Sequence, residues 1–282
     1  MAQTTLSTLA NKISPIVQES MFVASETAIM PGLVRTFTVP ANSGKVLQVP
    51  KFATTSAANV AEGTDLAGSA TDVAITPGKS DITLQEAGVM TVLTDMSRNY
   101  ATGNVVADLG RLFGEAIAKR HDQALTGLFS GFSNSLGAPQ DEVTVELLFK
   151  AYSTLKSQAV PGPYFGVFHP KAIYNVKKGL TNTFTNPNAG ILQNEAMREG
   201  YVGRIAGIDI FETSNVVEDS ATSVTNAVFS RDALGLAVGE NIKIATQRDE
   251  SLRAEEIVAT TVYGVAELHD TYGVKIVGDN QL

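Results

Sequence analysis

The chain has 282 residues, a formal net charge of −8 and no cysteine, so it is long enough to bury a substantial core but excludes disulfides, thiolate metal sites and cysteine nucleophiles. Its 44% hydrophobic residues favour folding, and its acidic balance argues against a dedicated nucleic-acid surface, which needs clustered Lys and Arg. No run of about 18 apolar residues predicts a membrane span, and no basic flank followed by an apolar stretch predicts a signal peptide.

The low charge content is the least ordinary feature of the composition. Charged residues make up 18% of the chain, against roughly 25% in a typical soluble domain. Charged groups are depleted at the centres of protein interfaces, so this value indicates a surface covered largely by copies of the same chain. A loop-rich β domain with a surface of Ser and Thr is the alternative that composition leaves open.

The first 32 residues are expected to form an arm with one short, weakly amphipathic helix. Ser14-Pro15 combines an N-cap residue with proline at the first helical position, and Pro31-Gly32 is expected to end the helix.

Residues 33–95 are expected to form a long, outstretched ribbon. Alternating patterns predict strands over 33–39, 45–52 and 81–94. The stretch 53–81 between them has no aromatic residue, and its only large aliphatic residues are Val60, Leu66, Val73 and Ile75. Because isolated two-stranded ribbons are marginal in water, this ribbon is either flexible or packed on something outside its own fold. We expect a neighbouring subunit to be what it packs on.

The strongest predicted helix follows, over about 24 residues from Asn104, and would be on the order of 36 Å long. One stripe at three- and four-residue spacing is expected to face inward: Val106, Leu109, Phe113, Ile117, Ala124 and Leu128. Asp122 and the other charged residues are expected to lie mostly off this stripe, and His121 is expected at the surface or an interface.

The second half of the chain mixes helices and strands. Helices are predicted over 144–159 and from His169-Pro170 to Gly179, with a short buried strand at 164–168. Further strands are predicted over 208–213, 227–230, 242–246, 257–268 and 273–277. The run R-D-E-S-L-R at 248–253 is interpreted as a charged hairpin tip, which is either a solvated turn or a salt-bridging contact between copies.

Catalytic patterns are missing from the sequence. Gly78-Lys79-Ser80 imitates the end of a phosphate-binding loop, but Val73 stands where the earlier glycine is required. Glu267 and His269 share a strand face, yet two ligands are a thin metal site, and His169 is interpreted as a cap or core histidine. We therefore predict no catalytic, cofactor-binding or metal-binding residue, and no enzyme.

Seven short segments have an order and spacing that can be compared with known families. They are V-P-K-F at 49–52, N-V-A-E-G at 59–63, A-x-x-x-D-x-A-L-x-G at 118–127, F-H-P at 168–170, G-x-x-x-G-I-D-I at 203–210, V-Y-G-V at 262–265 and G-V-K-I-V at 273–277. Together they resemble the major capsid protein of tailed bacteriophages, the Hong Kong 97-type shell fold, over nearly the whole chain.

This resemblance implies an α+β Hong Kong 97-type capsid fold with an N-arm, an extended E-loop hairpin, a long spine helix in the peripheral domain, and an axial domain. The implied parts are the N-arm 1–32, the E-loop 33–95, the peripheral domain 96–160, the axial domain 161–239, the peripheral-domain β-hairpin 240–265 and the axial return 266–282.

The implied function is structural: a self-assembling protein of the phage head, forming pentameric and hexameric capsomers of an icosahedral virion capsid around the genome. The implied partners are further copies of the chain, a separate scaffolding protein, a portal, a cement protein as a further candidate, and double-stranded DNA held without sequence-specific contacts. Because the sequence has no long helical prodomain, either the scaffold is a separate protein or this chain is the processed form. The implied place of assembly is the cytoplasm of a bacterial host. An encapsulin-like bacterial compartment shell is the alternative.

Two groups of residues are the candidates for subunit interfaces. They are Val60, Glu62 and Leu66 near the ribbon tip, and Arg248, Asp249, Glu250 and Arg253 at the charged hairpin tip. Residues 53–78 contain no lysine, which predicts non-covalent reinforcement of a shell rather than lysine cross-links.

Overall fold

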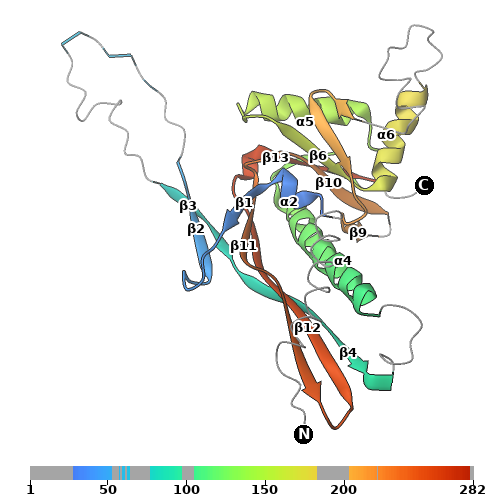
Figure 1. Ribbon diagram of the computed structural model, residues 1–282. Coiled ribbons are helices and arrows are strands. Elements are labelled where there is room, and N and C mark those ends of the chain that lie inside the picture. Colours follow the sequence, from blue (N-terminus) through green and yellow to red (C-terminus); the bar gives the residue numbers. More distant parts are fainter. Residues whose placement is uncertain are drawn as a thin grey trace.

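A computed structural model describes residues 28–52, 57, 59–60, 62–63, 77–96, 105–182, 203–220 and 222–279 (Figure 1). The helix predicted after Ser14, the proposed cap Asn104 and the interface candidate Leu66 lie outside these residues.

The main core surrounds a seven-stranded sheet. Its strands are, in spatial order, β5 (Asn134–Leu136), β13 (Gly273–Gly278), β10 (Ser223–Ser230), β6 (Tyr164–Phe168), β8 (Ile208–Glu212) and β7 (Arg204–Ile205), with β9 (Glu218–Ser220) paired to β10. All eight residues of β10 are buried, and helix α5 (Val145–Ser157) packs on β10 and β13. A strand buried on both faces is characteristic of a sheet covered on both sides.

A four-stranded sheet forms a long extension of the molecule. Its order is β1 (Arg35–Thr38), β11 (Leu234–Asp249), β12 (Ala254–Glu267) and β4 (Gln85–Thr94). Helix α4 (Val105–Thr126) lies beside this sheet in Figure 1 and continues into the 3₁₀ helix η1 (Gly127–Gly131). Phe113 and Ile117 of α4 pack with Leu93 and Ile257, so one face of the sheet is covered by the helix.

The base of the predicted ribbon packs on its own chain. Strands β2 (Val46–Lys51) and β3 (Gly78–Thr83) pair antiparallel and project from the body in Figure 1. Ile82 of β3 is fully buried and lies over two glycines. A Cβ atom at Gly264 would lie 2.5 Å from the Thr83 carbonyl oxygen, and one at Gly235 would lie 3.1 Å from Ile82 Cδ1. Glycine at these positions therefore lets β3 cross closely over β11 and β12.

Several sequence predictions of regular structure are confirmed. Strand β6 has the predicted bounds, α6 (Pro170–Asn182) begins at Pro170, and α5 falls within the predicted helix 144–159. The strand predicted over 242–246 is part of the longer β11, and β12 includes all of the strand predicted over 257–268 except Leu268.

Other predictions near the N-terminal ribbon and α6 are wrong. Pro31-Gly32 do not end a helix, because they lie inside the helical turn α2 (Met30–Leu33). The single strand predicted over 81–94 is divided at buried Leu84, because β3 pairs with β2 whereas β4 pairs with β12. Helix α6 continues past Gly179 to Asn182.

The stripe predicted for the long helix is confirmed at Phe113 and Ile117, and its members Ala124 and Leu128 pack, partly buried, against the main core. The inward face also includes residues near the C-terminal end of the helix that the sequence predicts to lie outside it. His121 follows Ile117 by four residues, is half-buried, and places its ring 4.5 Å from the ring of Tyr263. Asp122, expected off the stripe, is 0% exposed. Asp122 faces inward because the segment that includes Met30 packs against this end of α4, whereas His121 packs on Tyr263 of β12.

Candidate assembly surfaces

The charged hairpin tip lies in the turn between β11 and β12, as the sequence predicts. One carboxylate oxygen of Asp249 accepts hydrogen bonds from the backbone N–H groups of Ser251 (2.9 Å) and Leu252 (3.2 Å). The hydroxyl of Ser251 also donates to Asp249 and, with these backbone bonds, lowers the pKa of that carboxyl. Asp249 is therefore used in shaping the turn, which presents Leu252 to solvent with 60% exposure.

Arg248 is bound within its own chain. Its guanidinium donates to both carboxylate oxygens of Asp95, at 2.6 and 2.7 Å, and lies 3.4 Å from Glu250. The hydrogen bonds with Asp95 raise the pKa of Arg248 above its ordinary value. This bidentate pair fastens the end of β4 to the hairpin tip across 153 residues of sequence. Arg253, with its backbone in the left-handed region at φ 50°, is exposed at the same turn.

The candidates on the ribbon are only partly described. Val60 and Glu62 are both exposed. Phe52, at the end of β2, is 67% exposed, and sequence reasoning did not single it out. The prediction that residues 53–76 pack on a neighbouring subunit remains a prediction.

A surface that sequence reasoning missed is the outer face of the four-stranded sheet. By strand register, Met90 lies opposite Val258, which lies opposite Ala245, all on the face away from α4. Met90 and Val92 are exposed there, at 58% and 44%. We call Met90, Val92, Ala245 and Val258 the outer-face patch. The signal was present in V-M-T-V-L at 89–93, which is apolar at residues that face both sides of a strand.

The outer-face patch borders an unprotected sheet edge. In the described part of the chain, β4 is the last strand of its sheet and has no Lys or Pro among its ten residues. The ribbon strands, by contrast, include Pro50, Lys51 and Lys79. Natural proteins usually protect an exposed edge with such residues, so β4 is a strand suited to being covered.

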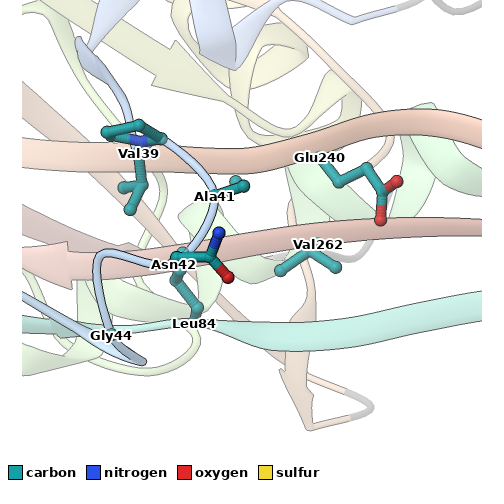
Figure 2. A pocket seen from close by; sticks show the side chains of 9 residues that line it. Val39, Ala41, Asn42, Gly44, Leu84, Glu240 and Val262 are labelled. Atoms are coloured by element: carbon teal, nitrogen blue, oxygen red, sulfur yellow. The ribbon is translucent and has the colours of Figure 1, made fainter.

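A shallow hollow of about 330 Å³ lies where the 40–44 turn passes β11 (Figure 2). Figure 2 shows Val39, Leu84 and Val262 around this hollow, with Glu240 and Asn42 as its polar groups. One carboxylate with no histidine or second acid does not make an acid–base or metal site. The hollow is therefore better suited to binding an apolar side chain than to catalysis or metal binding.

His169, His269 and Glu267, which the sequence singles out, all interact with groups of their own chain. Nδ1 of His169 accepts a hydrogen bond from the backbone N–H of Lys171 at the start of α6, and burial lowers the pKa of His169, as expected for a cap or core histidine. His269 stacks on Tyr272 at 4.6 Å, and burial together with Asp270 raises the pKa of Glu267. Among the described residues, no group of three or more His, Asp or Glu is placed to hold a metal ion. No helix in this part of the chain has the length and apolar character needed to cross a membrane.

Comparison with solved structures gives extensive matches. A structure from Mycobacterium phage Che8 matches with a TM-score of 0.69 at 20% identity, covering 89% of this chain and 91% of that one. The capsid of the cyanophage P-SCSP1u matches with a TM-score of 0.68 at 17% identity, covering 90% and 89%. A virus-like particle from Pyrococcus furiosus matches with a TM-score of 0.64 at 12% identity, covering 94% and 98%.

No family model matches the sequence, and no curated protein matches it. The matches to solved structures nevertheless cover about nine-tenths of the chain. The chain has the α+β Hong Kong 97-type fold that phage capsid structures share.

Proposed function

We propose that this chain is the major capsid protein of a tailed bacteriophage, a structural subunit without catalytic activity. Copies form pentameric and hexameric capsomers, and these close into an icosahedral shell around double-stranded DNA. The observation that carries the proposal is the fold match to phage capsids over about nine-tenths of the chain.

The surfaces support the same proposal on physical grounds. The outer-face patch presents apolar side chains beside an unprotected strand edge, and Phe52 and Leu252 are also exposed. Phe52 directly follows β2, and Leu252 lies in the turn between β11 and β12. Exposed apolar side chains on different elements suit a subunit with several neighbours, because head-to-tail contacts use different patches on each copy. The net charge of −8 suits a container that holds DNA without gripping it.

The division into parts implied by the resemblance is retained in the proposal. Residues 1–32 act as the N-arm and 33–95 as the E-loop. The peripheral domain comprises 96–160 and 240–265, and the axial domain comprises 161–239 and 266–282. A scaffolding protein and a portal are the expected partners, with a cement protein as a further candidate. The mature protein is located in the virion, which assembles in the cytoplasm of the bacterial host.

A second candidate function is an encapsulin-like bacterial compartment that encloses protein. The match to the virus-like particle from Pyrococcus furiosus, which covers 98% of that chain, favours it. The match to the Che8 structure has higher identity, 20% against 12%, which supports the phage capsid as the first candidate.

The proposal is tested by expressing the chain alone and together with the genes that flank it, followed by sedimentation and negative-stain microscopy. Closed icosahedral particles with five- and six-fold capsomers are expected. Nuclease-resistant DNA in particles from the native source supports the phage capsid, whereas co-purified protein cargo supports the compartment. A chain that remains monomeric under both expression conditions contradicts both candidates.

A further inference from the structure

A buried carboxylate in the long helix joins three parts of the molecule. Asp122 of α4 is 0% exposed. Its oxygens accept hydrogen bonds from the backbone N–H groups of Ile29 (3.5 Å) and Met30 (3.3 Å) and from Nδ2 of Asn215 (3.0 Å). Ile29 and Met30 lie next to Ala28, the first residue of the described N-terminal segment, and Asn215 lies in the loop between β8 and β9.

The loop is held to α4 by a second contact, whereas the Ile29 and Met30 N–H groups are held by the carboxylate. Thr126 Oγ1 donates to the Asn215 carbonyl oxygen at 3.1 Å, one turn along the same helix face. The backbone N–H of Asn215 in turn donates to Thr213 Oγ1 at 3.2 Å. Asp122 is therefore the polar contact that connects the N-terminal segment to the loop and the helix at once.

Burying a carboxylate is unfavourable unless hydrogen bonds or an opposite charge offset the loss of solvation. Burial raises the pKa of Asp122, although hydrogen bonds from Asn215, Ile29 and Met30 lower it in part. The charged form is thus less favourable in the folded chain than in water, and a neutral side chain of the same shape would not weaken the fold through loss of charge. Because the buried charge of Asp122 does not add to stability, the role of Asp122 is best explained by the backbone groups that it positions.

We propose that Asp122 is a positioning residue that fixes where residues 1–28 leave the subunit, by holding the Ile29 and Met30 N–H groups against the long helix. The arm then starts from one place and in one direction on every copy. The effect of Asp122 on particle assembly rests on the function proposed above, but its hydrogen bonds to the Ile29 and Met30 N–H groups are a property of the single chain.

The test uses Asp122→Asn and proteolysis by an enzyme that cleaves after glutamate. Glu26 lies three residues before Ile29, and Glu19 lies ten residues before it, so Glu19 serves as an internal reference. Loss of hydrogen bonds to a charged group is expected to raise cleavage after Glu26 about tenfold, with less than a twofold change after Glu19. The melting temperature is expected to stay within about 2 °C of the unmodified protein, because removing the buried charge offsets the lost bonds.

Glu115→Gln is the matched control. Glu115 is exposed on the same helix and lines the hollow of about 460 Å³ that also includes Ile29 and Asn215. Its neutralisation is expected to leave both cleavage rates unchanged. An unchanged Glu26 rate in Asp122→Asn overturns the proposal, as does equal acceleration at both bonds, which reports global unfolding, or an equal effect of Glu115→Gln.

If Asp122→Asn does not fold, hydrogen exchange of the unmodified protein provides the decision. The Ile29 and Met30 amides are expected to exchange about a hundredfold more slowly than in a free chain, and exchange at the free-chain rate overturns the proposal. Particle yield is measured separately and is expected to fall at least tenfold in Asp122→Asn. Absence of particles from the unmodified chain would contradict the proposed function and leave the cleavage result standing.

Discussion

Strands β10 and β4 show how differently the two sheets of this molecule are covered. All eight residues of β10 are buried, whereas Leu93 is the single buried residue among the ten of β4. Strand β10 lies between β13 and β6 within the sheet, but β4 ends its own sheet, with α4 on one face and the outer-face patch on the other. The seven-stranded sheet supplies its own core, and the four-stranded sheet leaves one face to be covered from outside.

This difference separates two kinds of residue. Substitutions around β10 should reduce the free energy of unfolding of the single chain, because they leave cavities in a packed core. Substitutions on the outer face of β4 should leave folding intact and reduce association, because the side chains are in water until another molecule covers them.

The largest effect on folding is expected from Phe229→Ala in β10. Phe229 is fully buried, and its ring lies 5.7 Å from that of Phe129. Truncation should lower the free energy of unfolding by about 3–5 kcal/mol, measured by urea denaturation. Phe149→Ala, on an exposed side chain of α5, is the matched control and should change it by less than about 1 kcal/mol. Equal losses in the two variants would contradict the assignment of the core.

The largest effect on assembly is expected from deleting residues 55–75. The base of the ribbon keeps its own packing through Ile82, and Lys51 Nζ and Ser80 Oγ each donate to the Leu268 carbonyl oxygen at 3.2 Å. The deleted chain should therefore stay soluble and folded, but it should form no stable capsomers in sedimentation. Replacement by a Gly-Ser linker of equal length is the control, and it should fail in the same way if the side chains of the tip are what bind. Normal particles from the deletion would refute the bracing of the ribbon by a neighbour.

A similar but smaller loss is expected from Met90→Glu combined with Val92→Glu. Both side chains are exposed, so the melting temperature should change by no more than about 2 °C, whereas particle yield should fall roughly tenfold because charge would be buried at an interface. Ser135→Glu, exposed on the edge strand β5, is the control and should leave the yield unchanged. If both proteins assemble equally well, the outer-face patch is not covered by another copy.

A more local effect is expected at the hairpin tip, where a charge swap separates two roles of Arg248. Arg248→Asp should lower the temperature at which particles dissociate, because it places a second carboxylate beside that of Asp95. Adding Asp95→Arg to the same chain should restore that temperature if the pair acts within one subunit. Failure of the swap, together with a matching loss in Arg253→Glu, would instead assign the tip to a contact between copies.

The sequence predicts those parts of the fold that depend on local patterns. Helix α4 and strand β6 follow from spacing and turn residues, and the charged tip follows from six consecutive residues. The change of strand partner at Leu84 could not be predicted, because the sequence I-T-L-Q-E at 82–86 has no turn residue, and the division depends on the close crossing at Gly264.

The candidate surfaces likewise could be predicted where they depend on neighbouring residues, and could not where they depend on residues distant in the sequence. The sequence singles out Arg248 and Asp249 by their charge, but not the Asp95 partner 153 residues away that determines how Arg248 is used. It misses Met90 because an apolar residue in a core and one at an interface produce the same pattern. It misplaces His121 and Asp122 because the width of the buried helix face depends on which segment packs there.

The smallest effect is expected from the histidine that caps α6, through the pH dependence of stability. Burial lowers the pKa of His169 below its ordinary value of 6.5, so the unfolded chain binds a proton at a pH where the folded chain does not. The contribution of neutral His169 to the free energy of unfolding is fully present above about pH 6.5 and is lost as the pH falls toward the lowered pKa. Asn at position 169 can accept the same hydrogen bond from the Lys171 N–H without ionising. Between pH 7.5 and 5.5, the urea midpoint of His169→Asn should therefore change less than that of the unmodified protein. His121 and His269, whose pKa values burial also lowers, contribute equally in both proteins. Identical shifts in the two proteins would show that the cap at α6 does not depend on a neutral His169.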